Sequence, residues 1–118
     1  MSEHRAHKRI DVAVRGELEH EGDTLAAETQ NLSTGGVALK VRQPVPDGAV
    51  VTVQLFLTQD GFEDPDEAPL VTKAAVRWTG ESDGGRHVVG LQFAKLTPAK
   101  RAQLGRFLAI VEEAAGAA

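Results

Sequence analysis

The stretch VTVQLFLT, residues 51–58, decides the fold class because it is the clearest strand of the chain. Apolar and polar side chains alternate along it: Val51, Val53, Leu55 and Leu57 share one face, and Thr52, Gln54 and Thr58 share the other. A period of two places successive side chains on opposite faces of a strand. Phe56 is the exception. We therefore expect a strand that is buried on one face.

The same alternation recurs on both sides of this stretch, at the spacing of hairpins. It predicts five further strands, over residues 10–20, 24–30, 37–42, 70–79 and 87–93. The fifth strand of the six places Trp78 on the inner face with Ala74 and Val76, so Trp78 is expected in the core. Residues 59–69 are acidic and contain Pro and Gly, which predicts a solvated loop. Six short strands in 118 residues favour a small closed or nearly closed antiparallel β-barrel.

A helix is predicted at the end of the chain. Thr97 and Pro98 are an N-cap hydroxyl followed by proline at the first helical position. Four apolar residues then follow at helical spacing on one stripe: Leu104, Phe107, Leu108 and Val111. We expect this stripe to cap the barrel or to pack on a partner.

Length and composition predict one domain over residues 1–118, divided into an arm (1–9), a barrel (10–94) and a helix (97–115). The chain is 42% hydrophobic, contains no cysteine, and has no apolar run long enough to span a membrane, so we expect a cytoplasmic protein without membrane insertion. The net charge of −4 argues against binding to a nucleic acid polymer. Residues 4–9 nevertheless contain only basic charges, which suits a small anionic ligand.

Two short stretches carry the candidate chemistry: RAHKR, residues 5–9, and NLSTGG, residues 31–36. The first places Arg5 and Arg9 just before a strand, and the second places an amide, a hydroxyl and two glycines where two strands meet. A guanidinium can bind a phosphate bidentately or donate to the O6 and N7 edge of guanine, and lysine cannot replace it in either task. Glycine lets a backbone or a ligand approach closely. Together they predict a site for an anionic, planar ligand.

The order Arg-x-x-x-Arg, strand, Asn-x-Ser-x-x-Gly resembles the signature of the PilZ domain family, and the late strands around Val76-Arg77-Trp78 and His87–Phe93 agree with that family. The resemblance extends from Arg5 to about Ile110. It implies a six-stranded barrel with a C-terminal helix and the bacterial second messenger cyclic di-GMP as ligand, with no cofactor or metal.

The resemblance also implies the ligand-binding residues. These are Arg5, Arg9, Asn31, Ser33 and Gly36, with His4, Lys8, Gly35 and Trp78 as secondary contacts. His4 stands where the family often has another arginine, so the resemblance leaves open whether one or two nucleotides bind. Structural readings also remain: the arginines can form a solubilising tail, and Asn31 and Ser33 can bond their own backbone in a turn.

The resemblance implies a receptor in motility or exopolysaccharide control that orders its arm over cyclic di-GMP and signals to an unknown protein effector. The chain would be a monomer or a ligand-dependent dimer. The alternative is a PilZ-like adaptor that binds protein and no nucleotide. We expect no enzymatic activity, since the sequence has no cysteine nucleophile, no Ser/His/Asp arrangement and no recognisable metal cluster.

Overall fold

The computed structural model describes residues 9–57 and 69–116. Three parts of the prediction lie outside the described residues: the arm up to residue 8, residue 58 at the end of the predicted strand, and residues 59–68 of the predicted acidic loop. The elements in order are β1 (Ile10–Asp11), β2 (Arg15–His20), β3 (Asp23–Leu32), β4 (Gly36–Val41), β5 (Val50–Leu55), β6 (Leu70–Ser82), η1 (Asp83–Gly85), β7 (Arg86–Phe93) and α1 (Pro98–Gly116).

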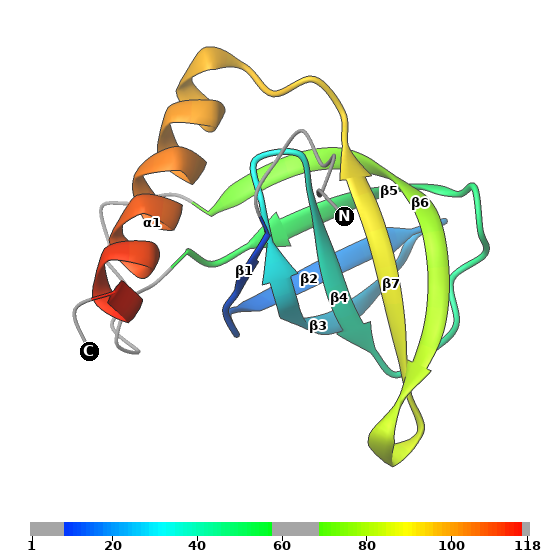
Figure 1. The fold of residues 1–118 in the computed structure, drawn as a ribbon. Coiled ribbons are helices and arrows are strands. Elements are labelled where there is room, and N and C mark those ends of the chain that lie inside the picture. Colours follow the sequence, from blue (N-terminus) through cyan, green and yellow to red (C-terminus); the bar gives the residue numbers. More distant parts are fainter. Residues whose placement is uncertain (1–8, 58–68, 117–118) are drawn as a thin grey trace, which may run out of the picture.

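The strands close into an antiparallel barrel, as predicted (Figure 1). Hydrogen-bonded neighbours follow the order β1-β3-β2-β5-β6-β7-β4, and β4 pairs again with β3. Six strands, β2 to β7, therefore form the wall, and β1 adds two residues beside the end of β3. The largest fully buried side chains come from several strands and from α1, and include Leu18, Leu39, Val53, Leu55, Leu70 and Leu104. Alternation thus directs one face of each strand into a single core.

The first strand is interrupted, so the prediction of one strand over residues 10–20 was wrong. β1 ends at Asp11 and β2 begins at Arg15. The gap is bridged by Thr29 of β3, which is only 1% exposed. Its hydroxyl donates to the Val12 carbonyl and accepts from the Val14 amide at 2.8 Å. The Thr29 amide also donates to the Val14 carbonyl at 2.9 Å, so this one residue holds the bend with both its side chain and its backbone.

Phe56, the exception in the alternation, lies beyond the end of its strand, because β5 ends at Leu55. The Phe56 amide donates to the Arg15 carbonyl at 3.0 Å, and the Arg15 guanidinium lies 5.5 Å from the centre of the Phe56 ring. The ring is half-buried under this cation. Since β5 stops before Phe56, this ring does not have to fit inside the barrel.

The helix begins where the sequence predicts. The Lys100 amide donates to the Thr97 hydroxyl at 3.2 Å, and the Arg101 amide donates to the Thr97 carbonyl at 2.9 Å. Leu104, Phe107 and Leu108 are buried in the same core as the barrel strands. The apolar stripe therefore packs against the barrel, and a linker leads from the end of β7 to the first turn of α1 (Figure 1).

Replacement of the cap, Thr97→Ala, is expected to lower the free energy of unfolding by about 1 kcal/mol, because the Lys100 amide loses its side-chain acceptor. Chemical denaturation followed by circular dichroism measures this change. The control is Thr97→Ser, which keeps the hydroxyl and should retain most of the stability. Equal losses in both variants would show that the cap is not the source of the effect.

Candidate functional site

A hollow of about 630 Å³ lies on the outer surface of the barrel. It extends from β6 across β7 and β4 to the β3–β4 turn, and on to the linker before α1. Its lining comes from five places in the sequence: Arg9, residues 31–38 except Leu32, Arg77 and Trp78, residues 90–96, and Arg101. Barrel closure is what places these segments together.

The β3–β4 turn is shaped by Ser33, which is 6% exposed. Its hydroxyl accepts hydrogen bonds from the amides of Gly35 at 3.1 Å and Gly36 at 3.2 Å, and it donates to the Gly36 carbonyl at 3.4 Å. The Ser33 amide donates to the same carbonyl at 2.9 Å. The hydroxyl thus closes the turn, as hydroxyl side chains often do. Direct contact of Ser33 with a ligand stays a prediction.

Gly36 has a packing reason to lack a side chain. A Cβ atom at this position would lie 2.2 Å from the Leu91 carbonyl oxygen of β7. That oxygen belongs to the backbone, so it cannot move aside as a side chain would. Gly36 therefore lets β4 pair closely with β7, opposite Gln92. Its predicted role as a bare surface under a ligand is a second, separate role that stays a prediction.

A β-bulge in β3 directs Asn31 outward. The pairing of β3 with β4 shifts register between Thr29 and Asn31, so that Gln30 is the extra residue. Thr29 is buried, and Leu32 on the far side of the bulge is also buried in the core. Strict alternation from Thr29 would have turned Asn31 inward and Leu32 outward. The bulge instead places the Asn31 side chain on the lining of the hollow.

A second bulge, in β6, overturns the prediction that Trp78 is a core residue. The pairing of β6 with β7 shifts between Val76 and Trp78, and Arg77 is the extra residue. Val76 is buried, whereas Trp78 is 40% exposed and lines the hollow. A Cβ atom on Gly90 would lie 2.1 Å from the indole, so the ring rests directly on that glycine. The bulge thus makes Trp78 an aromatic surface of the hollow.

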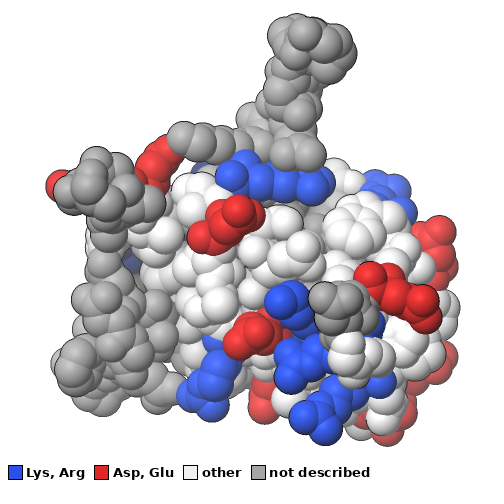
Figure 2. All heavy atoms as spheres, turned by 60° about the horizontal axis from the view of Figure 1, so that its bottom comes forward, with Lys and Arg blue, Asp and Glu red and all other residues white. Residues whose placement is uncertain are grey.

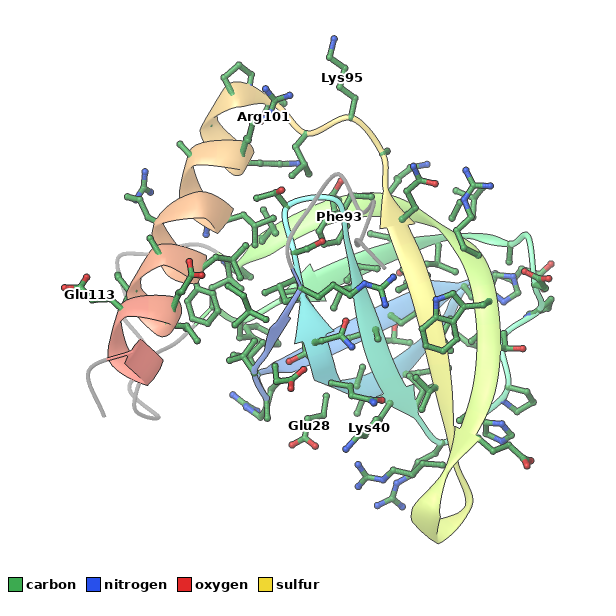
Figure 3. All side chains as sticks on the ribbon, viewed as in Figure 1. Glu28, Lys40, Phe93, Lys95, Arg101 and Glu113 are labelled. Carbon is green, nitrogen blue, oxygen red and sulfur yellow. The ribbon has the colours of Figure 1, made fainter. Side chains whose placement is uncertain are left out.

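Among the described residues, the charged side chains that line the hollow are all cationic: Arg9, Arg77, Lys95 and Arg101. Figure 3 shows Lys95 on the linker and Arg101 on the first turn of α1, at the end of the molecule opposite Glu28 and Lys40. Glu28 and Lys40 are register partners on β3 and β4, and the face turned forward in Figure 2 carries acidic groups among the basic ones. The charged lining of the hollow is therefore positive and suits an anion.

The structure brings six of the predicted site residues to this hollow: Arg9, Asn31, Ser33, Gly35, Gly36 and Trp78. Three others, His4, Arg5 and Lys8, lie outside the described residues. Sequence reasoning missed Arg77, Gln92, Lys95 and Arg101, which also line the hollow. Only the alternation gave a local signal for Gln92, since it places that side chain opposite the buried Leu91 and Phe93.

The family-model comparison matches the PilZ domain over residues 3–109. The chain belongs to the PilZ domain family. This match covers both the Arg-x-x-x-Arg stretch and the β3–β4 turn, and it extends into α1. A search of curated proteins finds no match to this PilZ chain. In the part of the chain that the structure describes, no helix is long and apolar enough to cross a membrane, and no three His, Cys, Asp or Glu side chains cluster as metal ligands would.

Solved structures share the fold at low sequence identity. The PilZ domain of YcgR from Escherichia coli, solved with c-di-GMP, has a TM-score of 0.76 at 18% identity, covering 96% of this chain and 95% of that one. The Bacillus subtilis inhibitor of motility MotI/DgrA has a TM-score of 0.73 at 16% identity, over 90% of this chain and 49% of that one. The K. pneumonia MrkH–c-di-GMP complex has a TM-score of 0.74 at 14% identity, over 99% and 57%. The chain thus spans about half the length of two of these proteins.

Proposed function

We propose that this PilZ domain is a receptor for cyclic di-GMP that binds the nucleotide in the hollow and signals by ordering its N-terminal arm against a partner protein. The observation that carries the proposal is the convergence of Arg9, the Asn31–Gly36 turn and Trp78 on one cationic hollow. Structures of similar fold, YcgR and MrkH, were solved with this nucleotide, which supports the same ligand class here. Binding involves no chemical step.

The hollow offers a complementary group for each part of a cyclic dinucleotide. Trp78 presents an exposed indole on which a purine can stack, and base–aromatic stacking contributes about 1–3 kcal/mol per base. Arg9, Lys95 and Arg101 bring positive charge for the two phosphates. Arg5 is the first arginine of the Arg-x-x-x-Arg motif, four residues before Arg9. We propose that it closes over the bound nucleotide with the rest of the arm. The effector would then recognise the closed arm, in control of motility or exopolysaccharide.

One observation favours the alternative of an adaptor without nucleotide. Ser33 shapes the turn and Gly36 admits β7, so both signature residues have roles that require no ligand. An adaptor could retain these residues for the fold alone. The cationic lining distinguishes the two proposals, because the fold does not need four basic side chains in one hollow.

Titration calorimetry of the full chain with cyclic di-GMP tests the receptor. We expect saturable binding, and we expect Arg9→Ala to weaken it by about 1–3 kcal/mol, by analogy with the loss of a bidentate arginine–guanine contact. Arg9 is exposed, so the free energy of unfolding should change little.

The matched control is Arg42→Ala, an exposed arginine just beyond the far end of β4 that does not line the hollow. This variant should bind as the wild type does. If both substitutions weakened binding equally, the loss of affinity would come from the change in net charge and not from a contact made by Arg9. No binding by the wild type would overturn the receptor proposal and leave the adaptor.

A further inference from the structure

Arg77 is held in place by a neighbouring side chain. It is the extra residue of the β6 bulge, and its Nε donates to the Oε1 atom of Gln92 on β7 at 2.6 Å. Both side chains are exposed and both line the hollow. Among the basic residues of the lining, only Arg77 has a side-chain hydrogen bond in the part of the chain that the structure describes. Its orientation is thus set before any ligand arrives, which reduces the entropy lost on binding.

The hydrogen bond leaves mainly donors free on this pair of side chains. A guanidinium has five donors and no acceptor, and the bond to Gln92 uses Nε alone, so the two terminal nitrogens remain. Gln92 must turn its oxygen toward Arg77, since Arg77 cannot accept. The Gln92 amide nitrogen, with two donors, then remains for another partner. Arg77 and Gln92 together therefore present an edge of donors, and the only acceptor left on the pair is the second lone pair of the Gln92 oxygen.

Guanine and adenine differ in what they offer to such an edge. On the same side of the ring, guanine presents two acceptors, N7 and O6, whereas adenine presents the N7 acceptor and the N6 amino donor. An arginine fork matches the guanine pair bidentately. Adenine would place its amino group against donors of the protein. Such a mismatch leaves polar groups unpaired, which is how binding sites reject near-identical ligands.

We propose that the Arg77–Gln92 pair selects guanine over adenine, with Arg77 as the reading residue and Gln92 as the residue that positions it. This inference rests on the proposed binding of a cyclic dinucleotide in the hollow. Trp78 follows Arg77 directly and lies on the adjoining Gly90, so a base stacked on the indole would have its edge beside the donors of the pair. The β6 bulge would then supply both the stacking surface, Trp78, and the guanine-reading residue, Arg77.

The test compares the affinities of the full chain for cyclic di-GMP and cyclic di-AMP by titration calorimetry. The wild type should prefer cyclic di-GMP, and Arg77→Ala should reduce that preference by roughly 5- to 150-fold, the range for one bidentate base contact. Gln92→Leu should reduce the preference by less, because it removes the Gln92 donors and frees Arg77 to move but leaves the guanidinium in place. Gln92→Glu keeps a partner for Arg77 but turns an acceptor outward, so it should shift the ratio toward cyclic di-AMP.

The matched control is Arg86→Ala, at the start of β7 and outside the lining of the hollow, which should leave the ratio unchanged. Equal weakening of both nucleotides by Arg77→Ala would assign Arg77 to phosphate and overturn selection by this pair. A wild type that binds both nucleotides equally would also overturn it while leaving the receptor proposal intact. A wild type that binds neither would instead overturn the receptor proposal itself.

Discussion

Gly36→Ala is expected to lower the free energy of unfolding by about 3 kcal/mol, at the upper end of the range for overpacking. The added Cβ would meet the Leu91 carbonyl oxygen at 2.2 Å, and the Leu91 carbonyl carbon and Gln92 Cα at 3.3 and 3.4 Å. All three are backbone atoms, so the methyl group can be accommodated only if β4 moves away from β7. Denaturation by guanidinium, followed by circular dichroism, measures the loss.

The chain offers a matched control in Gly105, which lies inside α1, where an added Cβ would meet no atom within 4 Å outside the helix's own backbone. Gly105→Ala makes the same chemical change, and there alanine favours the helix by about 1 kcal/mol. The two substitutions should therefore have opposite signs. A Gly36→Ala variant as stable as the wild type would show that β7 can move away from the added methyl group at little cost in free energy. The packing account of Gly36 would then be wrong.

Thr29→Val is expected to lower the free energy of unfolding by about 2–5 kcal/mol. Valine has nearly the same shape but no hydroxyl, so the Val14 amide and the Val12 carbonyl both lose their partner. Each buried backbone group without a partner costs about 1–3 kcal/mol. The bend between β1 and β2 would keep only the bond from the Thr29 amide to the Val14 carbonyl, and we expect β1 to loosen.

Hydrogen exchange resolved by residue distinguishes this local loss from general destabilisation. The Val14 amide should exchange faster in Thr29→Val than amides in the centre of β5, such as that of Val53. Thr29→Ser is the control, because it keeps the hydroxyl and should retain protection at Val14. Unchanged exchange at Val14 in the valine variant would contradict a bridging role for Thr29.

Strand alternation predicted the barrel because the period of two directs apolar side chains to one face along most strands, and the closed core confirmed it. It failed where a single inserted residue reverses the faces. Gln30 and Arg77 are such residues, and they turn Asn31 and Trp78 outward. Neither bulge contains a glycine or a proline, so no such residue indicated it in the sequence. The appearance of Leu32 out of phase with Ala27 and Thr29 was the available signal for the first one.

Only those site residues that lie close together in the sequence could be predicted to lie close together in space. Asn31, Ser33, Gly35 and Gly36 occupy one turn, so their proximity follows from the hairpin alone. Arg77, Gln92, Lys95 and Arg101 reach the hollow only because β4 pairs with β7, β7 with β6, and α1 packs back on the barrel. No short-range pattern encodes those pairings. The residues that bring specificity in our proposal are therefore the ones that depend on tertiary structure.

Because Trp78 packs on Gly90 at the hollow, its intrinsic fluorescence reports on this site. The chain contains one tryptophan and no tyrosine, so excitation near the red edge of protein absorption reaches a single indole. That indole lies at the hollow with part of its surface in water. Intrinsic emission therefore originates at the site itself, and its colour and quenching describe this one environment without any attached dye.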